Sequence, residues 1–496
     1  MSSSEQASVG FGRASLWGSW KTDKKPADEI DVRTLAARRG GSTALVAVAD
    51  FMQLWPSSCL RIRARIAREL GIAEESVGIF ATQNHGVDGD GMPGLDSDAI
   101  DRAFVTAARE ALASLRPAAV AMVAIRPDPP LNVCRRIRFG NLGAFTFYFG
   151  YRMDDLAPGR ADVSHLMKLA LARMVEGKRL YPVRSFEVAG KGPEDYLVPD
   201  GPVPVPSPLY LPPPTDGLLQ ALFFREAGGG GGAQGKPIGA LLRFPAHPNT
   251  ANRGDVDWSS GDYPVYVRRR LEEAFGGRVL FMTGPCGDSS TLLGRKSLES
   301  AGQTGRQVAD AALAALPAAE WQPVGPVQAF AQEVELRFRP DYPASLEAAK
   351  ATCEELETNL RGKTAGRPLA EIKRLLERWE LALYVSQGAV PRWTGVDACG
   401  RAGETFTHPL YVARIGPAVI AGLPGEPFGG ISVRMRNETL GDRLIVSEAG
   451  NGFLSYVPTA EEYPLGGYGP SAALCDASSE ERLVRAIRTA IEAKGW

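Results

Sequence analysis

Two glycine turns place side chains with acid–base or metal-binding capacity directly after apolar segments. Glu426 stands in the run LPGEP, after the apolar residues 417–423, and Tyr456 ends the run GFLSY, after the apolar residues 444–446. Carboxylates and phenols presented at strand ends by tight turns are typical of the sites of α/β enzymes. Glu426 could instead be a carboxylate at a helix N-terminus, stabilised by the helix dipole, and Tyr456 a core aromatic residue.

Two of the four histidines occupy comparable positions. His85 comes a few residues after the apolar segment 77–82, and His247 follows the apolar segment 238–244. A single histidine is more often a structural hydrogen-bonding residue than a ligand, but two at the carboxyl ends of strands support each other as site residues. Together with the acidic and phenolic turns they indicate a metal-assisted hydrolase, because zinc accepts both histidine nitrogen and carboxylate oxygen. The other two histidines fit structural roles: His165 inside a predicted helix and His408 at a strand start.

A serine-containing turn supplies a candidate nucleophile. The run GDSS at 287–290 follows the apolar segment 279–283. Ser290 could be a nucleophile there, and the backbone amides of the run could instead form an anion-binding nest. No lysine follows the glycines at the spacing of a phosphate-binding loop. A serine in a glycine turn is usually only a turn residue, so this run alone is weak evidence.

The composition argues against several classes of function. The chain has 496 residues, of which 44% are hydrophobic and 23% charged, as is ordinary for a globular protein. Its net charge of −1 gives no electrostatic basis for binding nucleic acid or an anionic membrane. Six scattered cysteines form no C-x-x-C pair, which argues against a thiolate zinc site or a disulfide framework. Since we see no signal-peptide pattern and no apolar run of about 20 residues, we expect a cytoplasmic protein without stable membrane association.

The elements that must position these side chains alternate along the chain. Short apolar runs at 43–49, 77–82 and 118–125 alternate with helical patterns at 59–70 and 98–115. This alternation predicts an α/β fold with a mixed, largely parallel sheet covered by helices.

We expect one large catalytic domain, because the candidate site residues come from both ends of the chain. It would span residues 37–496, after an irregular N-terminal arm at 1–36. Two insertions are predicted within it, a Pro/Gly-rich excursion at 202–232 and a helical hairpin at 344–383. Both are candidates for walls or lids over the site.

Several of these runs, taken in order, resemble the neutral, non-lysosomal ceramidases, a family of zinc-dependent amide hydrolases. The resemblance covers roughly Val32 to the end of the chain. Two of the matching runs are fairly specific to the family: LPGE, and GFLSYVPT followed by EEY and a later tyrosine. The other runs are weaker evidence. The matching runs are TQNH at 82–85, GKPIGALLRFPAHPN at 235–249, GDSS at 287–290, RIG at 414–416, PGE at 424–426, and GFLSY at 452–456, continuing through EEY at 461–463 to Tyr468.

In that family, two histidines, a glutamate and a tyrosine hold a zinc ion. The resemblance implies that His247, Glu426 and Tyr456 are three of these ligands. It also implies that Tyr468 lies near the scissile carbonyl and that Ser290 takes part in catalysis. Arg135, in the run NVCRR, matches an active-site arginine by a looser alignment.

One departure concerns the metal itself. The family usually reads T-H-x-H with the first histidine on zinc, whereas this chain has Gln83 at that position. Glutamine is a poor zinc ligand because its neutral amide oxygen competes weakly with water. Either His85 takes over as ligand, or Asp88 or Asp90 compensates, or the metal is weakened or lost. We expect a Zn²⁺ site with His85 in or beside it, so the expected ligands are His85, His247, Glu426 and Tyr456.

A second departure concerns the ends of the chain. Secreted members of the family carry a signal peptide and an additional C-terminal β-sandwich, whereas this sequence ends with a predicted helix at Trp496. We therefore expect a soluble acyl-amine substrate rather than ceramide itself.

The sequence thus predicts a metal-assisted hydrolase that cleaves a linear amide C–N bond of a small molecule. One alternative is an acyltransferase, cyclising or condensing enzyme that acts through Ser290 with an altered or lost metal site. Another is a binding protein that has lost the chemistry. The predicted catalytic residues are Ser290, Tyr468, Arg135 and His85.

Overall fold

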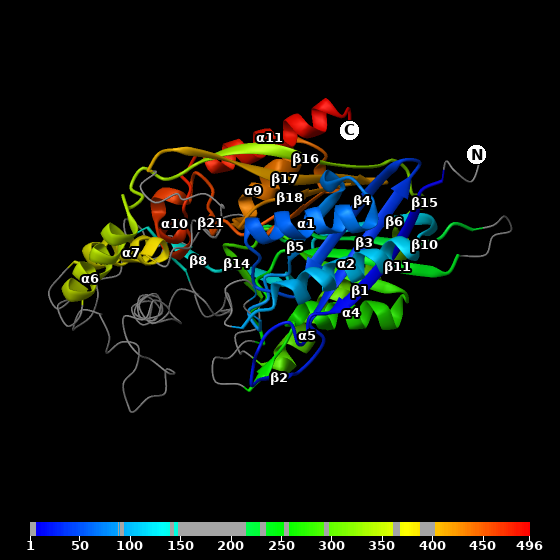
Figure 1. Ribbon diagram of the computed structural model, residues 1–496, viewed down its shortest axis with the longest axis horizontal. Coiled ribbons are helices and arrows are strands. Elements are labelled where there is room, and N and C mark those ends of the chain that lie inside the picture. The colour runs from blue at the N-terminus through cyan, green and yellow to red at the C-terminus, as the bar shows by residue number, and fades with distance from the viewer. Residues whose placement is uncertain are drawn as a thin grey trace.

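The computed structural model of the protein describes residues 6–87, 89, 94–138, 143–146, 215–228, 235–251, 257–291, 297–360, 368–386 and 402–496. These residues form four stacked layers, in the order helices, four-stranded sheet, nine-stranded sheet, helices (Figure 1). The predicted α/β class is confirmed. No helix in this part of the chain is both long and apolar enough to cross a membrane.

The nine-stranded sheet is mixed, as predicted, but the expectation that it is largely parallel is wrong. Within the described residues, only the pairs β4–β5 and β11–β13 are parallel. The other neighbours run antiparallel: β1 and β3, which the sequence patterns missed, enter between β6 and β4, and β10 pairs antiparallel with both β6 and β11. The order is β13 (Arg278–Thr283), β11 (Pro237–Phe244), β10 (Leu219–Glu226), β6 (Arg116–Ile125), β1 (Ser8–Ser15), β3 (Asp31–Arg39), β4 (Ser42–Ala49) and β5 (Val77–Ala81), with β15 (Trp321–Pro323) paired to β6.

The strands β1 and β3 lie in the middle of this sheet, so the expectation of an irregular arm at 1–36 is wrong. In β1, glycines replace large side chains where helix α2 (Ser97–Ala113) approaches. A Cβ added to Gly12 would lie 2.0 Å from the Ala107 carbonyl oxygen. In β3, Arg33 is buried and forms ion pairs with Asp31 and Glu272. Small residues and paired charges therefore hide the apolar pattern of both strands.

The four-stranded sheet buries side chains on both of its faces. In β17, Leu410 and Val412 face the outer helices, whereas Tyr411 and Ala413 face the nine-stranded sheet. This alternation follows from the two-residue period of a strand. The order is β16 (Val327–Arg337), β17 (Thr405–Ile415), β18 (Ala418–Gly422) and β20 (Leu444–Ser447), of which only β18–β20 is parallel among the described strands.

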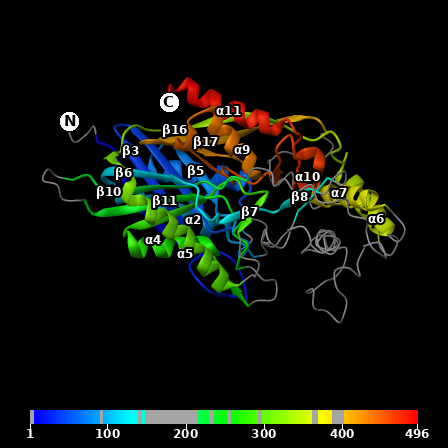
Figure 2. The same ribbon diagram turned by 180° about the vertical axis from the view of Figure 1, so that it is seen from behind.

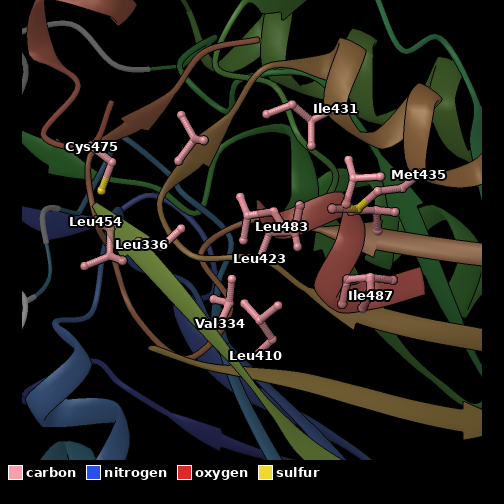
Figure 3. Close-up of a cluster of buried hydrophobic side chains, with 14 of the residues drawn as sticks. Val334, Leu336, Leu410, Leu423, Ile431, Met435, Leu454, Cys475, Leu483 and Ile487 are labelled. Atoms are coloured by element: carbon pink, nitrogen blue, oxygen red, sulfur yellow. The ribbon is translucent and has the colours of Figure 1, made fainter. Parts of the chain in front are cut away.

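Helices α9 (Gly429–Glu438) and α11 (Ser479–Ala493) cover the outer face of this sheet. Figure 3 shows part of the core under these helices, where Leu483 of α11 lies beside Leu423 and Ile431 of α9 belongs to the same cluster. Leu423 precedes the Glu426 turn, so this core fixes the end of β18 from which that turn departs.

The far face of the nine-stranded sheet is covered by two pairs of helices. α1 (Pro56–Leu70) and α2 lie over β3, β4 and β5 (Figure 1), and α4 (Tyr263–Ala274) and α5 (Leu298–Ala315) lie over β10, β11 and β13 (Figure 2). These helices and the four-stranded sheet enclose the nine-stranded sheet on both faces, so its strands other than β1 and β3 read as apolar runs.

Smaller elements complete the description. Helices α6 (Leu346–Leu360) and α7 (Leu369–Ser386) pack on each other within the predicted 344–383 hairpin, at the same end of the molecule as α10 (Tyr468–Ala472) (Figure 1). Residues 202–214 and 229–232 of the predicted excursion lie outside the described residues, and its described part carries β10 of the nine-stranded sheet, so that part is not an excursion. The short strand pairs are β2 (Lys25–Pro26) with β12 (Trp258–Ser259), β7 (Asn132–Cys134) with β14 (Ser289–Thr291), β8 (Arg136–Arg138) with β9 (Ala144–Thr146), and β19 (Glu426–Pro427) with β21 (Tyr456–Val457).

Candidate functional site

The candidate site forms where the carboxyl ends of strands from both sheets converge. β5 and β13 are opposite edges of the nine-stranded sheet, yet the Thr283 hydroxyl of β13 donates to the Thr82 carbonyl oxygen just after β5 (2.6 Å). The sheet is therefore curled as well as twisted, so that its two edges reach one place. From the second sheet, the Ser447 hydroxyl of β20 donates to the Thr283 carbonyl oxygen (2.8 Å). The loops after these strands carry the predicted site residues.

The loop after β5 carries Gln83 and His85. Gln83 is fully buried and has a φ of 60°, which a non-glycine residue adopts only where its surroundings hold it. The Asn84 side-chain amide holds the loop by donating to the Asp50 carbonyl oxygen (3.0 Å). The His85 N–H donates to the Pro248 carbonyl oxygen (2.9 Å), which joins this loop to the loop after β11.

The loop after β11 carries His247, which is 1% exposed. Its backbone forms a parallel bridge with Ser290, and its ring centroid lies 5.2 Å from that of His85. The ring nitrogen Nδ1 lies 3.0 Å from the Cys286 carbonyl oxygen. Since a carbonyl oxygen only accepts, Nδ1 carries a proton. The opposite nitrogen, Nε2, faces the Glu426 carboxylate oxygen Oε2 at 3.4 Å.

Glu426 and Tyr456 are neighbours on paired strands. β19 and β21 run parallel, with Glu426 directly opposite Tyr456 in the register. Gly425 has a φ of 65°, which lets the chain turn sharply before Glu426. Burial raises the pKa of the Glu426 carboxyl, and the nearby Tyr456, Arg135 and Gln83 act in the opposite direction. The two glycine turns therefore meet at one site.

The helix-terminus interpretation of Glu426 is wrong. Helix α9 begins at Gly429, whose N–H donates to the Asp288 carboxylate (2.8 Å), so Asp288 is the carboxylate at that helix start. The anion-nest interpretation of the GDSS run is also wrong. The Gly287 and Ser289 amides both donate to backbone carbonyl oxygens, and the run enters strand β14.

Arg135 lies against the phenol of Tyr456. Its guanidinium is 1% exposed and donates to the Tyr456 hydroxyl (3.0 Å) and to the Gly287 carbonyl oxygen (2.8 Å from Nη2). The β7–β14 pair holds it there, because Arg135 follows β7 directly and Gly287 precedes β14. A cation beside the phenol favours negative charge on the phenol oxygen.

Tyr468 is partly buried and begins the short helix α10. Its ring centroid lies 5.2 Å from that of Tyr456, edge to face. The preceding N–H, of Gly467, donates to the Glu377 carboxylate of α7 (2.6 Å). The helical pair α6–α7 therefore borders the segment that carries Tyr468.

Two fully buried residues of the site were missed by the sequence reasoning. Cys286 follows β13 and Glu448 follows β20, and their side chains meet, with Sγ 3.0 Å from Oε1. Cys286 Sγ also lies 3.3 Å from His247 Nδ1 and 3.4 Å from Gln83 Oε1. The available signal was position: both residues come directly after apolar runs, like the histidines that were singled out.

The structure brings several of the predicted metal ligands close together. His247 Nε2 and Glu426 Oε2 face each other beside the phenol of Tyr456, and the ring of His85 lies next to that of His247. Across the described ranges, no three His, Cys, Asp or Glu side chains gather closely enough to hold a metal ion. Asp88, Asp90 and His165 lie outside these ranges. His408 is buried in β17, where burial lowers its pKa to about 4, as fits a structural histidine.

The fold has counterparts among solved structures. The neutral ceramidase of Pseudomonas aeruginosa aligns with 99% of this chain and 75% of its own, at 17% identity and a TM-score of 0.61. A ceramidase complexed with C2 aligns with 99% of this chain and 76% of its own, at 16% identity and the same TM-score. No family model and no curated protein matches the sequence. The chain therefore has the fold of the neutral ceramidases.

Proposed function

We propose that the protein is a hydrolase that cleaves the amide C–N bond of a small acyl-amine with the help of a bound zinc ion. The observation that carries the proposal is the pair His247 Nε2 and Glu426 Oε2, 3.4 Å apart and beside Tyr456. The pair stands on a fold shared with two ceramidases, enzymes that cleave an amide.

The residues present fit a zinc ion by their chemistry. With a proton on Nδ1, a neutral His247 presents the lone pair of Nε2 toward a carboxylate oxygen, and two such acceptors repel each other unless a proton or a metal cation lies between them. Ligand atoms about 2.0–2.1 Å from a tetrahedral zinc are roughly 3.4 Å apart. The Cys286 carbonyl oxygen on Nδ1 is the kind of outer contact that orients a metal-bound histidine. His247, Glu426 and Tyr456 would hold the ion.

The other residues would have separate roles in amide hydrolysis. A bound zinc ion would polarise the substrate carbonyl and lower the pKa of a water molecule. Arg135 would stabilise negative charge on the Tyr456 oxygen, and Tyr468 would donate its O–H to the carbonyl oxygen as that oxygen becomes negative. His85, beside His247, would accept a proton from the attacking water and deliver it to the departing amine nitrogen.

The test combines hydrolysis with metal content. Purified protein is incubated with N-acyl-aminocoumarins of increasing acyl length, and its zinc is measured by mass spectrometry. Glu426→Gln should lower kcat/KM by more than about 100-fold, since loss of an outer-shell contact alone costs 10–100-fold. Glu461→Gln is the control, because this carboxylate is exposed and pairs with Arg138. Full activity of Glu426→Gln, or activity that survives removal of all metal, would refute the proposal.

A separate variant tests the alternative chemistry. Ser290 is buried, and its backbone is bridged to that of His247. If the enzyme transfers acyl groups through Ser290 without metal, Ser290→Ala abolishes turnover while chelation has no effect. In the hydrolase that we propose, chelation abolishes turnover and added zinc restores it.

A further inference from the structure

Tyr468 follows a turn of two consecutive glycines. Gly466 has φ and ψ of 67° and −154°, and Gly467 has 85° and −177°, a backbone region that is open essentially to glycine alone. Glycine also enters many other conformations at little cost, so two glycines in a row leave the next residue free to move unless other contacts hold the turn. Those contacts therefore decide where the Tyr468 side chain lies.

The buried Arg136 holds the turn on the side of the candidate site. Its side chain is 0% exposed, and Nη2 donates to the Gly466 carbonyl oxygen (2.9 Å). Nε donates to the carboxylate of Glu462, four residues before Gly466 (2.8 Å). Arg136 directly follows Arg135, which donates to the Tyr456 hydroxyl, so these contacts connect the turn to the site.

Lys373 and Glu377 of α7 also contact the turn. They lie one helical turn apart and form an ion pair, with side-chain exposures of 7% and 21%. The Lys373 ammonium donates to the Leu465 carbonyl oxygen (3.1 Å), and Glu377 Oε1 accepts from the Gly467 N–H (2.6 Å). A Cβ added to Gly466 would lie 2.3 Å from Glu377 Oε1 and 2.5 Å from Lys373 Nζ, so the two charged groups lie directly against the turn.

The burial of this ion pair ties its stability to the turn. An ammonium group can be buried at little cost only when it is paired and hydrogen-bonded. Lys373 meets this condition through Glu377 and the Leu465 carbonyl oxygen together. Hydrogen bonds to charged groups are also stronger than those between neutral groups, and Glu377 gives the Gly467 N–H such a bond. The ion pair and the turn therefore stabilise each other.

We propose that Lys373 and Glu377 are positioning residues that hold the Gly466–Gly467 turn and so set where the Tyr468 hydroxyl lies. The assignment rests on the proposed function and deepens it, because it gives the α6–α7 hairpin a part in catalysis through Tyr468. The alternative is a purely structural role, in which the pair only attaches the hairpin to the rest of the molecule. In that case, loss of the pair changes stability but not the position of Tyr468.

The position of Tyr468 can be followed by fluorine NMR, which needs neither substrate nor metal. Fluorotyrosine is incorporated at position 468 alone, and its signal reports the surroundings of the ring, which packs on Tyr456. Glu377→Ala removes the acceptor for the Gly467 N–H, so the signal should move toward that of free fluorotyrosine. Arg378→Ala is the control, because it changes an exposed residue of the same helix. An unchanged signal in Glu377→Ala overturns the proposal.

Lys373→Met gives the same decision should Glu377→Ala fold poorly. Methionine keeps an apolar stem but removes the donor to the Leu465 carbonyl oxygen, so the signal should again move. A signal that stays in place in Lys373→Met would leave the pair a structural role alone.

Turnover of N-acyl-aminocoumarins tests whether the pair acts through the Tyr468 hydroxyl. A displacement of about 1 Å can cost 100-fold in rate. We expect kcat to fall roughly tenfold or more in Glu377→Ala, with KM little changed. Glu377→Gln keeps an acceptor oxygen for the Gly467 N–H and should restore most of the loss.

A double variant then identifies the residue through which Glu377 acts. In a Tyr468→Phe background, Glu377→Ala should cost little more, because the hydroxyl that it positions is absent. Losses that multiply in the double variant would show that Glu377 acts elsewhere and refute the proposal. If the protein hydrolyses no amide, the proposed function fails, and the fluorine signal still decides whether the pair holds Tyr468. If it hydrolyses amides while the signal is unchanged in Glu377→Ala, only the positioning role fails.

Discussion

Replacing Asp216 with asparagine should weaken the connection between the segment that carries His247 and the segment that carries Glu426. Asp216 precedes β10 and accepts from Arg243 of β11 (2.5 Å) and from Arg436 of α9 (2.8 Å). The Ser432 hydroxyl of α9 also donates to it (2.6 Å). β11 leads to His247, and α9 follows the Glu426 turn. The carboxylate therefore clamps the supports of both residues.

The magnitude follows from the burial of these charges. Side-chain exposure is 1% for Asp216, 0% for Arg243 and 3% for Arg436. Removing one partner of a buried pair costs about 3–5 kcal/mol, because the remaining charge is left uncompensated. At about 2.1 cal/mol/K per residue, cooperative unfolding of the whole chain has an entropy near 1 kcal/mol/K. The melting temperature should therefore fall by roughly 3–5 °C.

Calorimetry at one fixed scan rate measures the change. The control is Asp310→Asn, since Asp310 forms an exposed pair with Arg270, worth at most about 1 kcal/mol. Arg436→Met should fall between the two, because it leaves Asp216 paired with Arg243. Equal melting temperatures for Asp216→Asn and Asp310→Asn would refute the reasoning.

The same clamp has a pH dependence of known sign. Burial alone would raise the pKa of Asp216, but Arg243 and Arg436 outweigh it and hold the pKa far below its ordinary value. The stabilisation is therefore present above about pH 4, the unfolded-state value, and is lost as the pH falls toward the folded-state pKa. The difference in melting temperature between the wild type and Asp216→Asn should therefore become smaller at acidic pH.

Two further predictions concern the sheet and a buried carboxyl. Gly12→Ala should lower stability by about 1–3 kcal/mol, because its Cβ would meet the Ala107 carbonyl oxygen. Gly41→Ala should leave stability unchanged, because its Cβ would have no atom within 4 Å. Thermal unfolding of the two variants measures the difference. Burial raises the pKa of Asp28 to about 6, so its stabilising effect is full below the unfolded value near 3.8 and is lost as the pH rises through 6. The free energy of unfolding of Asp28→Asn, relative to that of the wild type, should therefore rise between pH 4 and pH 7 by up to about 3 kcal/mol. The same difference between the two proteins at both pH values would contradict this.

Much of the scaffold could be predicted from local patterns. The apolar run of β4 and the amphipathic pattern of α2 specify their own element type, because burial on two faces or on one stripe leaves a regular period in the sequence. The order of elements could not be read in the same way. The sequence patterns did not predict β1 and β3, because Gly12 makes room for α2 and Arg33 is buried with paired charges.

The same distinction between local sequence patterns and tertiary structure applies to the candidate site. The sequence by itself determined that Glu426, Tyr456 and His247 stand at the ends of apolar segments, because tight turns and apolar runs are local features. Only the tertiary structure decided that Cys286 and Glu448 belong with them, with Cys286 Sγ between Gln83 Oε1 and Glu448 Oε1. The physical reason is the curling of the nine-stranded sheet, which brings its two edges together at Thr82 and Thr283 and so joins loops about 200 residues apart.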